Sequence, residues 1–275
     1  MAIGNEATRD LVAGPVLTRR RAIQAGCGGV LAMTATPVRA TSPAEGRGFG
    51  WRPSGAVGMM RRTPPRSPAF TVMEAGPSPV LLGFPWYRNF ERPVERNGAW
   101  WIGLGRDWGE AIGGHIVCLR PPSLRDAPGA WEFYDQGDSH ACAGFAASRA
   151  ASLLRQRLFD GFRLYETAKH YDSWRGDGYD GTSVAGALEA LVEEGPWPLR
   201  ETADEPIRSA AIAGWRFAET LPEILAALES REGFVRVLNS WGNAYPREVR
   251  LPLKAVERLL AEGAEFGVAI DRFAA

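Results

Sequence analysis

The order in which strand-like and helix-like segments follow one another constrains the fold of this chain more than any other feature. Short apolar runs bounded by turn residues, typical of strands, occupy residues 79–120 and recur from residue 215 onward. Between residues 141 and 194, apolar residues instead recur at helical spacing. Helices grouped in the middle and strands at both ends predict an α+β fold, in which one sheet is assembled from the two ends of the chain.

The same patterns predict individual elements. We expect strands at residues 79–84, 99–103, 114–119, 215–218, 234–238 and 266–270. We expect helices at residues 141–158, 162–171, 183–194, 221–229 and 252–261, the third with Thr182 as its N-cap.

The first 40 residues have the features of an export signal. Three arginines begin at Arg19, a mildly apolar, Gly-rich run continues to Met33, and a loosely cleavage-like end follows at Ala40. The paired arginines resemble a twin-arginine signal, although Ala22 stands where that pattern prefers Phe. Residues 1–40 therefore predict a signal peptide and an exported protein, periplasmic or extracellular. The alternative is a basic tail on a cytoplasmic protein.

Residues 41–75 are rich in Pro, Gly, Arg and Ser and show no hydrophobic periodicity. Such a composition predicts a flexible linker without a core of its own. The folded domain is accordingly expected to span residues 76–275.

Charge and composition exclude several classes of partner. Lys plus Arg and Asp plus Glu both number 32, so nothing favours nucleic acid as a partner. No apolar run reaches the roughly 20 residues of a membrane-spanning helix, so we expect no stable membrane insertion. No Cys and His cluster has zinc-ligand spacing, and the acidic loop at residues 172–180 lacks the spacing of a calcium loop. Neither a metal nor another cofactor is expected.

Of the three cysteines, Cys142 is the candidate nucleophile. An odd, small number of cysteines argues against a disulfide framework, and Cys27 lies in the expected signal. Cys142 comes at the start of an expected helix, where backbone N–H groups and the helix dipole favour a thiolate. Gln136 lies six residues earlier, behind a glycine. Its side chain is a candidate donor to an oxyanion beside the Cys142 backbone N–H.

The segment from Asp135 to Cys142, which reads Asp-Gln-Gly-Asp-Ser-His-Ala-Cys and continues Ala-Gly-Phe-Ala, resembles the nucleophile segment of the papain family. Asn239 begins an Asn-Ser-Trp-Gly segment that is similar to a second motif of that family. Ala143 departs from the pattern, since many relatives carry Trp there. The resemblance extends from about residue 79 to residue 272.

This resemblance implies a two-lobed papain-like fold and hydrolysis of peptide bonds through a thioester acyl-enzyme, with a peptide or protein as substrate. It implies that Cys142 is the nucleophile, that Gln136 donates to the oxyanion, and that Asn239 orients the catalytic histidine. It also implies that Trp241 packs over the Asn–His pair.

The catalytic histidine must be one of three. The usual family order points to His170, which lies in an expected helix far from Asn239, and His140 is only two residues before the nucleophile. His115 instead lies in Gly-Gly-His-Ile-Val-Cys-Leu, which resembles the family's histidine strand, and residues 79–87 resemble the strand before it. We therefore expect a circular permutation, with His115 as base and then acid.

Two alternatives stay open. One is a cell-wall amidase or acyltransferase of papain-like fold, and the other is a catalytically inactive binding module. Cys118 lies three residues after His115, so its side chain is expected on the opposite face of the strand, as a core thiol.

Overall fold

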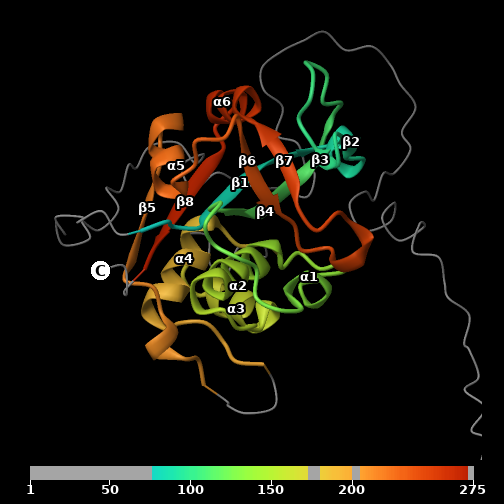
Figure 1. The fold of residues 1–275 in the computed structure, drawn as a ribbon. Coiled ribbons are helices and arrows are strands. Elements are labelled where there is room, and N and C mark those ends of the chain that lie inside the picture. The colour runs from blue at the N-terminus through green and yellow to red at the C-terminus, as the bar shows by residue number, and fades with distance from the viewer. Residues whose placement is uncertain (1–75, 173–179, 200–204, 272–275) are drawn as a thin grey trace, which may run out of the picture.

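The computed structural model describes residues 76–172, 180–199 and 205–271. The expected signal peptide and linker lie outside these residues. Within them, the chain forms one eight-stranded mixed sheet with helices on both faces (Figure 1). The α+β prediction is confirmed.

The sheet joins strands from both ends of the described chain. Its order is β2-β3-β7-β6-β4-β1-β8-β5. β1 (Val80–Tyr87) lies between β4 (Ala111–Arg120) and β8 (Glu265–Ile270) and is antiparallel to both. β4 pairs in turn with β6 (Phe234–Leu238). The expectation of a sheet built from both ends of the chain is therefore confirmed.

The other strands extend the two sides of this centre. They are β2 (Val94–Arg96), β3 (Ala99–Trp101), β5 (Gly214–Phe217) and β7 (Val249–Pro252). β2 and β7 were not predicted. β2 was missed because all three of its residues are exposed and two of them are charged, so it has no buried apolar side.

The described residues form five longer helices and four short helical segments, of which three are 3-10 helices. The longer helices are α2 (Cys142–Arg155), α3 (Gly161–Lys169), α4 (Val184–Glu193), α5 (Leu221–Leu228) and α6 (Leu253–Ala261). The short segments are α1 (Ala130–Phe133), η2 (Arg88–Glu91), η3 (Arg208–Ala210) and η4 (Gly242–Ala244).

The predicted N-cap of α4 was wrong by one residue. Ser183, not Thr182, is the cap, and its hydroxyl accepts a hydrogen bond from the Gly186 N–H at 2.8 Å. Ser and Thr are both good caps, so their order in the sequence alone does not distinguish them.

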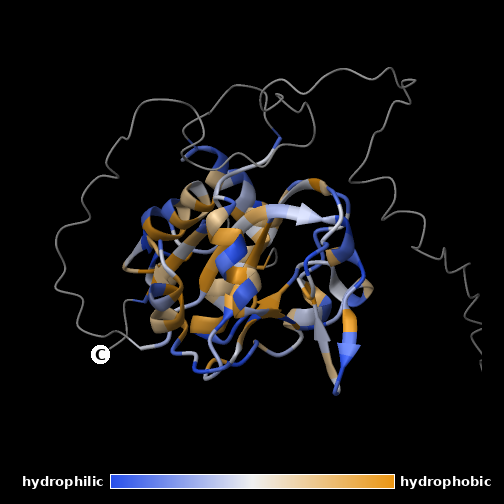
Figure 2. Cartoon of the chain, turned by 90° about the horizontal axis from the view of Figure 1, so that it is seen from above, coloured by the Kyte–Doolittle hydropathy of each residue, from blue (hydrophilic) through white to orange (hydrophobic). Residues whose placement is uncertain are grey.

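Alternate residues of the central strands face two different hydrophobic clusters. In β1, Leu82 and Phe84 pack in the cluster covered by α5 and α6, whereas Leu81 packs in the cluster covered by α2 and α4. Figure 2 shows hydrophobic segments toward the middle of the domain and hydrophilic ones toward its outer loops. Cys118 belongs to the second cluster, and burial raises its pKa to about 12. It is the core thiol that the sequence predicted.

The contact between α2 and α3 depends on a glycine. A Cβ atom at Gly144 would overlap the Gly161 carbonyl oxygen and the backbone of Tyr165. These obstacles belong to backbone, which cannot move aside as the end of a side chain can.

We therefore predict that Gly144→Ala lowers the free energy of unfolding by about 1–3 kcal/mol because the two helices must separate. Urea denaturation measures this loss. Gly214→Ala is the control, since a Cβ there meets nothing within 4 Å, and its effect should stay within about 0.5 kcal/mol. An equal loss in both variants would contradict the proposed close contact.

Candidate active site

Cys142 is the first residue of α2, as the sequence predicted. It is half-buried and is not part of a disulfide. The N-cap residue is Ala141, which makes no side-chain capping bond. Because alanine has no acceptor, no cap side chain competes with an anion for the N–H groups of the first turn. The local structure therefore suits a thiolate or a bound oxyanion.

His115 and Asn239 are brought into direct contact by the pairing of β4 with β6. Asn239 follows the last residue of β6, and the His115 Nε2 atom lies 2.9 Å from the Asn239 Oδ1 atom. The Ser240 backbone N–H donates to the same Oδ1 atom at 2.7 Å. A backbone N–H can only donate, so this atom is the amide oxygen and Nε2 must carry a proton. In the neutral imidazole, Nδ1 is then the acceptor.

Aromatic rings surround the His115 imidazole. Trp241 stacks on it with ring centroids 4.9 Å apart and an interplanar angle of 17°, in line with the expected packing of this residue. Trp86 meets it edge-on at 4.9 Å. His115 is only 5% exposed, and burial lowers its pKa to about 4, although the hydrogen bond with Asn239 opposes the shift. A neutral imidazole is thus favoured at rest.

Trp86 was not identified from the sequence as a site residue. The predicted strand ended at Phe84, whereas β1 continues to Tyr87. Trp86 is two residues after Phe84, which lies opposite His115 in the sheet. The signal was the apolar run that continues through Phe-Pro-Trp-Tyr, within residues 79–87 that resemble the strand before the histidine strand.

The loop that leads to Cys142 is bonded to the segment that begins with Asn239. The Gln136 N–H donates to the Ser240 carbonyl at 2.8 Å, and the Gly242 N–H donates to the Tyr134 carbonyl at 3.1 Å. An isolated β-bridge joins Asp135 and Trp241 between these two bonds. The two sequence motifs therefore lie side by side in space.

The Gln136 side chain is buried in this loop. It is 6% exposed, and its Nε2 atom donates to the Ser139 carbonyl at 3.0 Å. An amide nitrogen has two N–H groups, so one remains for another acceptor. Its Oε1 atom and the Asn239 Nδ2 atom are buried without a hydrogen-bond partner in the described structure. Unsatisfied buried polar atoms are rare, and these two belong to residues of the candidate site, although others lie elsewhere in the described structure.

The helix that begins with Cys142 packs on β4, the strand that carries His115, whereas the His115 ring itself contacts Trp86 and Trp241 of the other cluster. Ala143 of that helix and Ile116 of that strand belong to the same hydrophobic cluster, with Cys142 at its edge. The helix that begins with the thiol is thus docked on the sheet beside the strand that carries the imidazole.

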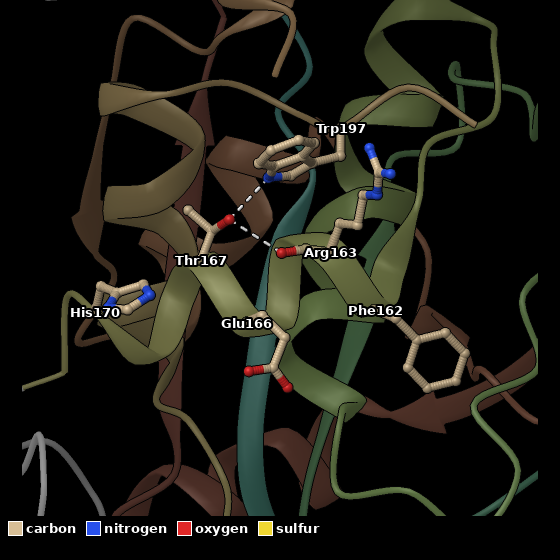
Figure 3. Close-up of a pocket in the computed structure, with 6 residues that line it drawn as sticks. All are labelled: Phe162, Arg163, Glu166, Thr167, His170 and Trp197. Carbon is tan, nitrogen blue, oxygen red and sulfur yellow. Dashed lines mark hydrogen bonds between the residues drawn. The ribbon is translucent and has the colours of Figure 1, made fainter. Parts of the chain in front are cut away.

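The other two histidines have different surroundings. The His140 Nδ1 atom lies 2.8 Å from the Asp180 Oδ2 atom, and this hydrogen bond lowers the pKa of the Asp180 carboxyl. His170 is exposed at the end of α3. His170 lines a hollow with five other residues, Phe162, Arg163, Glu166, Thr167 and Trp197 (Figure 3).

That hollow does not include the four candidate site residues. Two of its side chains are bonded to each other, since the Trp197 Nε1–H donates to the Thr167 hydroxyl at 2.7 Å (Figure 3). His115 is therefore the histidine that the geometry associates with Asn239.

The described ranges contain neither a cluster of metal-ligating side chains nor a membrane-spanning helix. Within residues 76–172, 180–199 and 205–271, no three His, Cys, Asp or Glu side chains gather to hold a metal ion. In the same ranges, no helix combines the length and the apolar character needed to cross a membrane. Most of the acidic loop at residues 172–180 lies outside the described residues.

Comparison of the chain with family models, with curated proteins and with solved structures finds no match.

The low pKa of His115 predicts how stability depends on pH. The unfolded imidazole takes up a proton near pH 6.5, whereas the folded one does so only near pH 4. The unfolded state therefore binds more protons between these values. We expect the free energy of unfolding to fall by about 1 kcal/mol per pH unit from this group as the pH drops through the window.

Urea denaturation at several pH values measures this slope in wild type and in His115→Gln, which should lack the His115 component. His170→Gln is the matched control, because that imidazole is exposed. If His115 instead increased stability as the pH fell, the folded state would hold an imidazolium and the prediction would be wrong.

Proposed function

We propose that this chain is a cysteine peptidase of papain-like, two-lobed and circularly permuted fold. The observation that carries the proposal is the hydrogen bond between His115 and Asn239, two residues taken from separate sequence motifs. The loop leading to Cys142 is bonded to the residues next to Asn239, which supports placing the thiol in the same site.

The proposed roles follow from the atoms that each residue offers. The Cys142 sulfur attacks the carbonyl carbon of a peptide bond while the Nδ1 atom of neutral His115 takes the thiol proton. The tetrahedral oxyanion accepts hydrogen bonds from the Cys142 backbone N–H and from the Gln136 side-chain N–H. Asn239 holds the imidazole in the tautomer that leaves Nδ1 as the acceptor.

The reaction is completed by three further proton transfers. Collapse of the intermediate forms a thioester, and the amine leaves with the proton that His115 had accepted. His115 then takes a proton from water, which attacks the thioester and releases the acid. The thiol regains its proton, so the enzyme returns to its starting state.

A circular permutation accounts for the chain order. β1 and β4 precede the Cys142 helix in sequence, yet they lie between strands that follow it. A catalytic constellation depends on the positions of its groups and not on their order along the chain. The helical part around α2, α3 and α4 would then be one lobe, and the sheet with α5 and α6 the other.

The first test is covalent labelling by an epoxide inhibitor at neutral pH. Wild type should gain one inhibitor molecule, measured by intact-protein mass, and Cys142→Ala should gain none. His115→Ala should lower the labelling rate by roughly 10²- to 10⁴-fold, since the base is lost. His170→Ala is the control and should label like wild type.

Labelling that persists in Cys142→Ala, or that depends on His170 in place of His115, would refute the assignment. A wild type that is not labelled at all would favour the inactive binding module. Product analysis on casein and on peptidoglycan fragments separates a peptidase from a cell-wall amidase.

A second test concerns Gln136. We predict that Gln136→Ala lowers peptide hydrolysis by roughly 10²- to 10³-fold, because one oxyanion donor is removed. Alkylation of Cys142 by iodoacetamide forms no oxyanion, so its rate should change little. Hydrolysis is measured with a fluorogenic peptide that wild type cleaves. Equal losses in both rates would indicate that Gln136 supports only the loop structure.

A further inference from the structure

A fully buried arginine lies on the same helix as the candidate nucleophile. Arg149 is two helical turns after Cys142, and its side chain is 0% exposed. Its Nη1 atom donates to the Asn239 carbonyl oxygen at 2.8 Å, while Nη2 and Nε donate to the Asp126 carboxylate. The guanidinium thus links the nucleophile helix to the residue that binds the His115 imidazole.

The Asp126 side chain is nearly as buried as that of Arg149, with only 4% of it exposed. Removing two charges from water is costly, and replacing a buried ion pair by apolar residues is often neutral or stabilising. Stability alone is therefore a weak explanation for this pair. A planar guanidinium does, however, fix the directions of its donors more strictly than a flexible apolar side chain fixes its contacts.

By bonding to the Asn239 carbonyl, Arg149 fixes the orientation of a peptide that affects the His115 imidazole. The Asn239 Oδ1 atom accepts from both the His115 Nε2 and the Ser240 N–H. A rotation of the peptide between Asn239 and Ser240 would therefore move the amide oxygen that orients the ring. That peptide contains the carbonyl to which Arg149 donates.

We propose that Arg149, held by Asp126, is a positioning residue for the His115 imidazole. It anchors the Asn239 carbonyl and so keeps Oδ1 in place to accept the Nε2 proton. The same helix carries Cys142 about 10 Å away along its axis, so thiol and imidazole are positioned relative to one rigid element. The consequence for catalysis rests on the proposed function, whereas the effect on the ring does not.

The test variant removes both charges together. Arg149→Met with Asp126→Leu leaves no buried charge unpaired, which avoids the penalty of a single substitution. Circular dichroism verifies that the variant is folded. Two properties are then compared with wild type: the His115 tautomer and the rate at which iodoacetamide alkylates Cys142 across pH.

The tautomer is read by NMR of protein with ¹⁵N-labelled histidine. Wild-type His115 should show a proton on Nε2, and the variant should show a mixture of the two tautomers. The alkylation rate near neutral pH should fall by roughly 10- to 100-fold, as expected when reacting groups lose their alignment. Its pH profile should move toward that of an ordinary thiol, near pH 8.5.

A matched control exists on the same helix. Arg155 also donates to an aspartate, Asp271, at 2.7 and 3.0 Å, and to a backbone carbonyl, that of Ala211, at 3.2 Å. Arg155→Met with Asp271→Leu removes a similar anchor away from Asn239. Its His115 tautomer and alkylation rate should equal those of wild type.

The outcomes separate this inference from the proposed function. A wild-type tautomer and an unchanged alkylation profile in the Arg149 pair would overturn the positioning role and leave the peptidase proposal intact. A tautomer change, in a chain whose Cys142 is no more reactive than an ordinary thiol, would support the positioning role and refute the peptidase proposal.

If the double variant does not fold, Arg149→Lys tests the positioning role in its place. Lysine keeps the charge opposite Asp126 but is shorter and lacks the planar fork. We expect a smaller tautomer change and a smaller fall in alkylation rate than in the double variant. Wild-type behaviour in both measurements would overturn the inference.

Discussion

The pairing of β4 with β6 is the interaction on which the site depends. His115 and Asn239 are 124 positions apart in the chain, and this pairing brings the strands that carry them together. Closing so long a loop costs conformational entropy, which hydrophobic burial must offset. Both faces of the sheet supply that burial, because alternate residues of β1 and β4 enter two separate clusters. The imidazole is therefore positioned by the core of the whole domain and not by a local turn.

Burial of the imidazole has two opposing effects on its chemistry. Desolvation lowers the resting pKa of His115 to about 4, which makes the neutral imidazole a weak base. The same low-dielectric surroundings strengthen its attraction to a thiolate. In the proposed reaction, the negative charge that forms on the Cys142 sulfur would raise the pKa of the imidazole that accepts its proton. Proton transfer and attack would then be coupled, and the aromatic rings that contact His115 would shield that coupling from water.

Local sequence patterns predicted most of the fold. Of the site, they predicted only the residues that belong to recognisable motifs. The helix beginning at Cys142 and the strand carrying His115 could be found because apolar spacing is a property of neighbouring residues. Trp86 and the Arg149–Asp126 pair could not, since their importance comes from partners far away in the chain. A signal did exist for Arg149: it is a charged residue within the apolar and small residues of the buried face of α2. Sequence alone does not show which distant groups such a residue binds.

The contacts of helix α2 show how the proposed circular permutation is compatible with a defined site. It begins with Cys142, contacts the Asn239 carbonyl through Arg149, and is tied to Asp271 through Arg155. Asn239 follows β6 and Asp271 follows β8, so two separate strands of the sheet hold one helix. Neither link uses the covalent connection between the helix and the strands that precede it. In the proposed permutation, moving β1 and β4 to the beginning of the chain would change only loops, whereas the contact of Arg149 with the Asn239 carbonyl would still hold the nucleophile helix against the residue that orients His115.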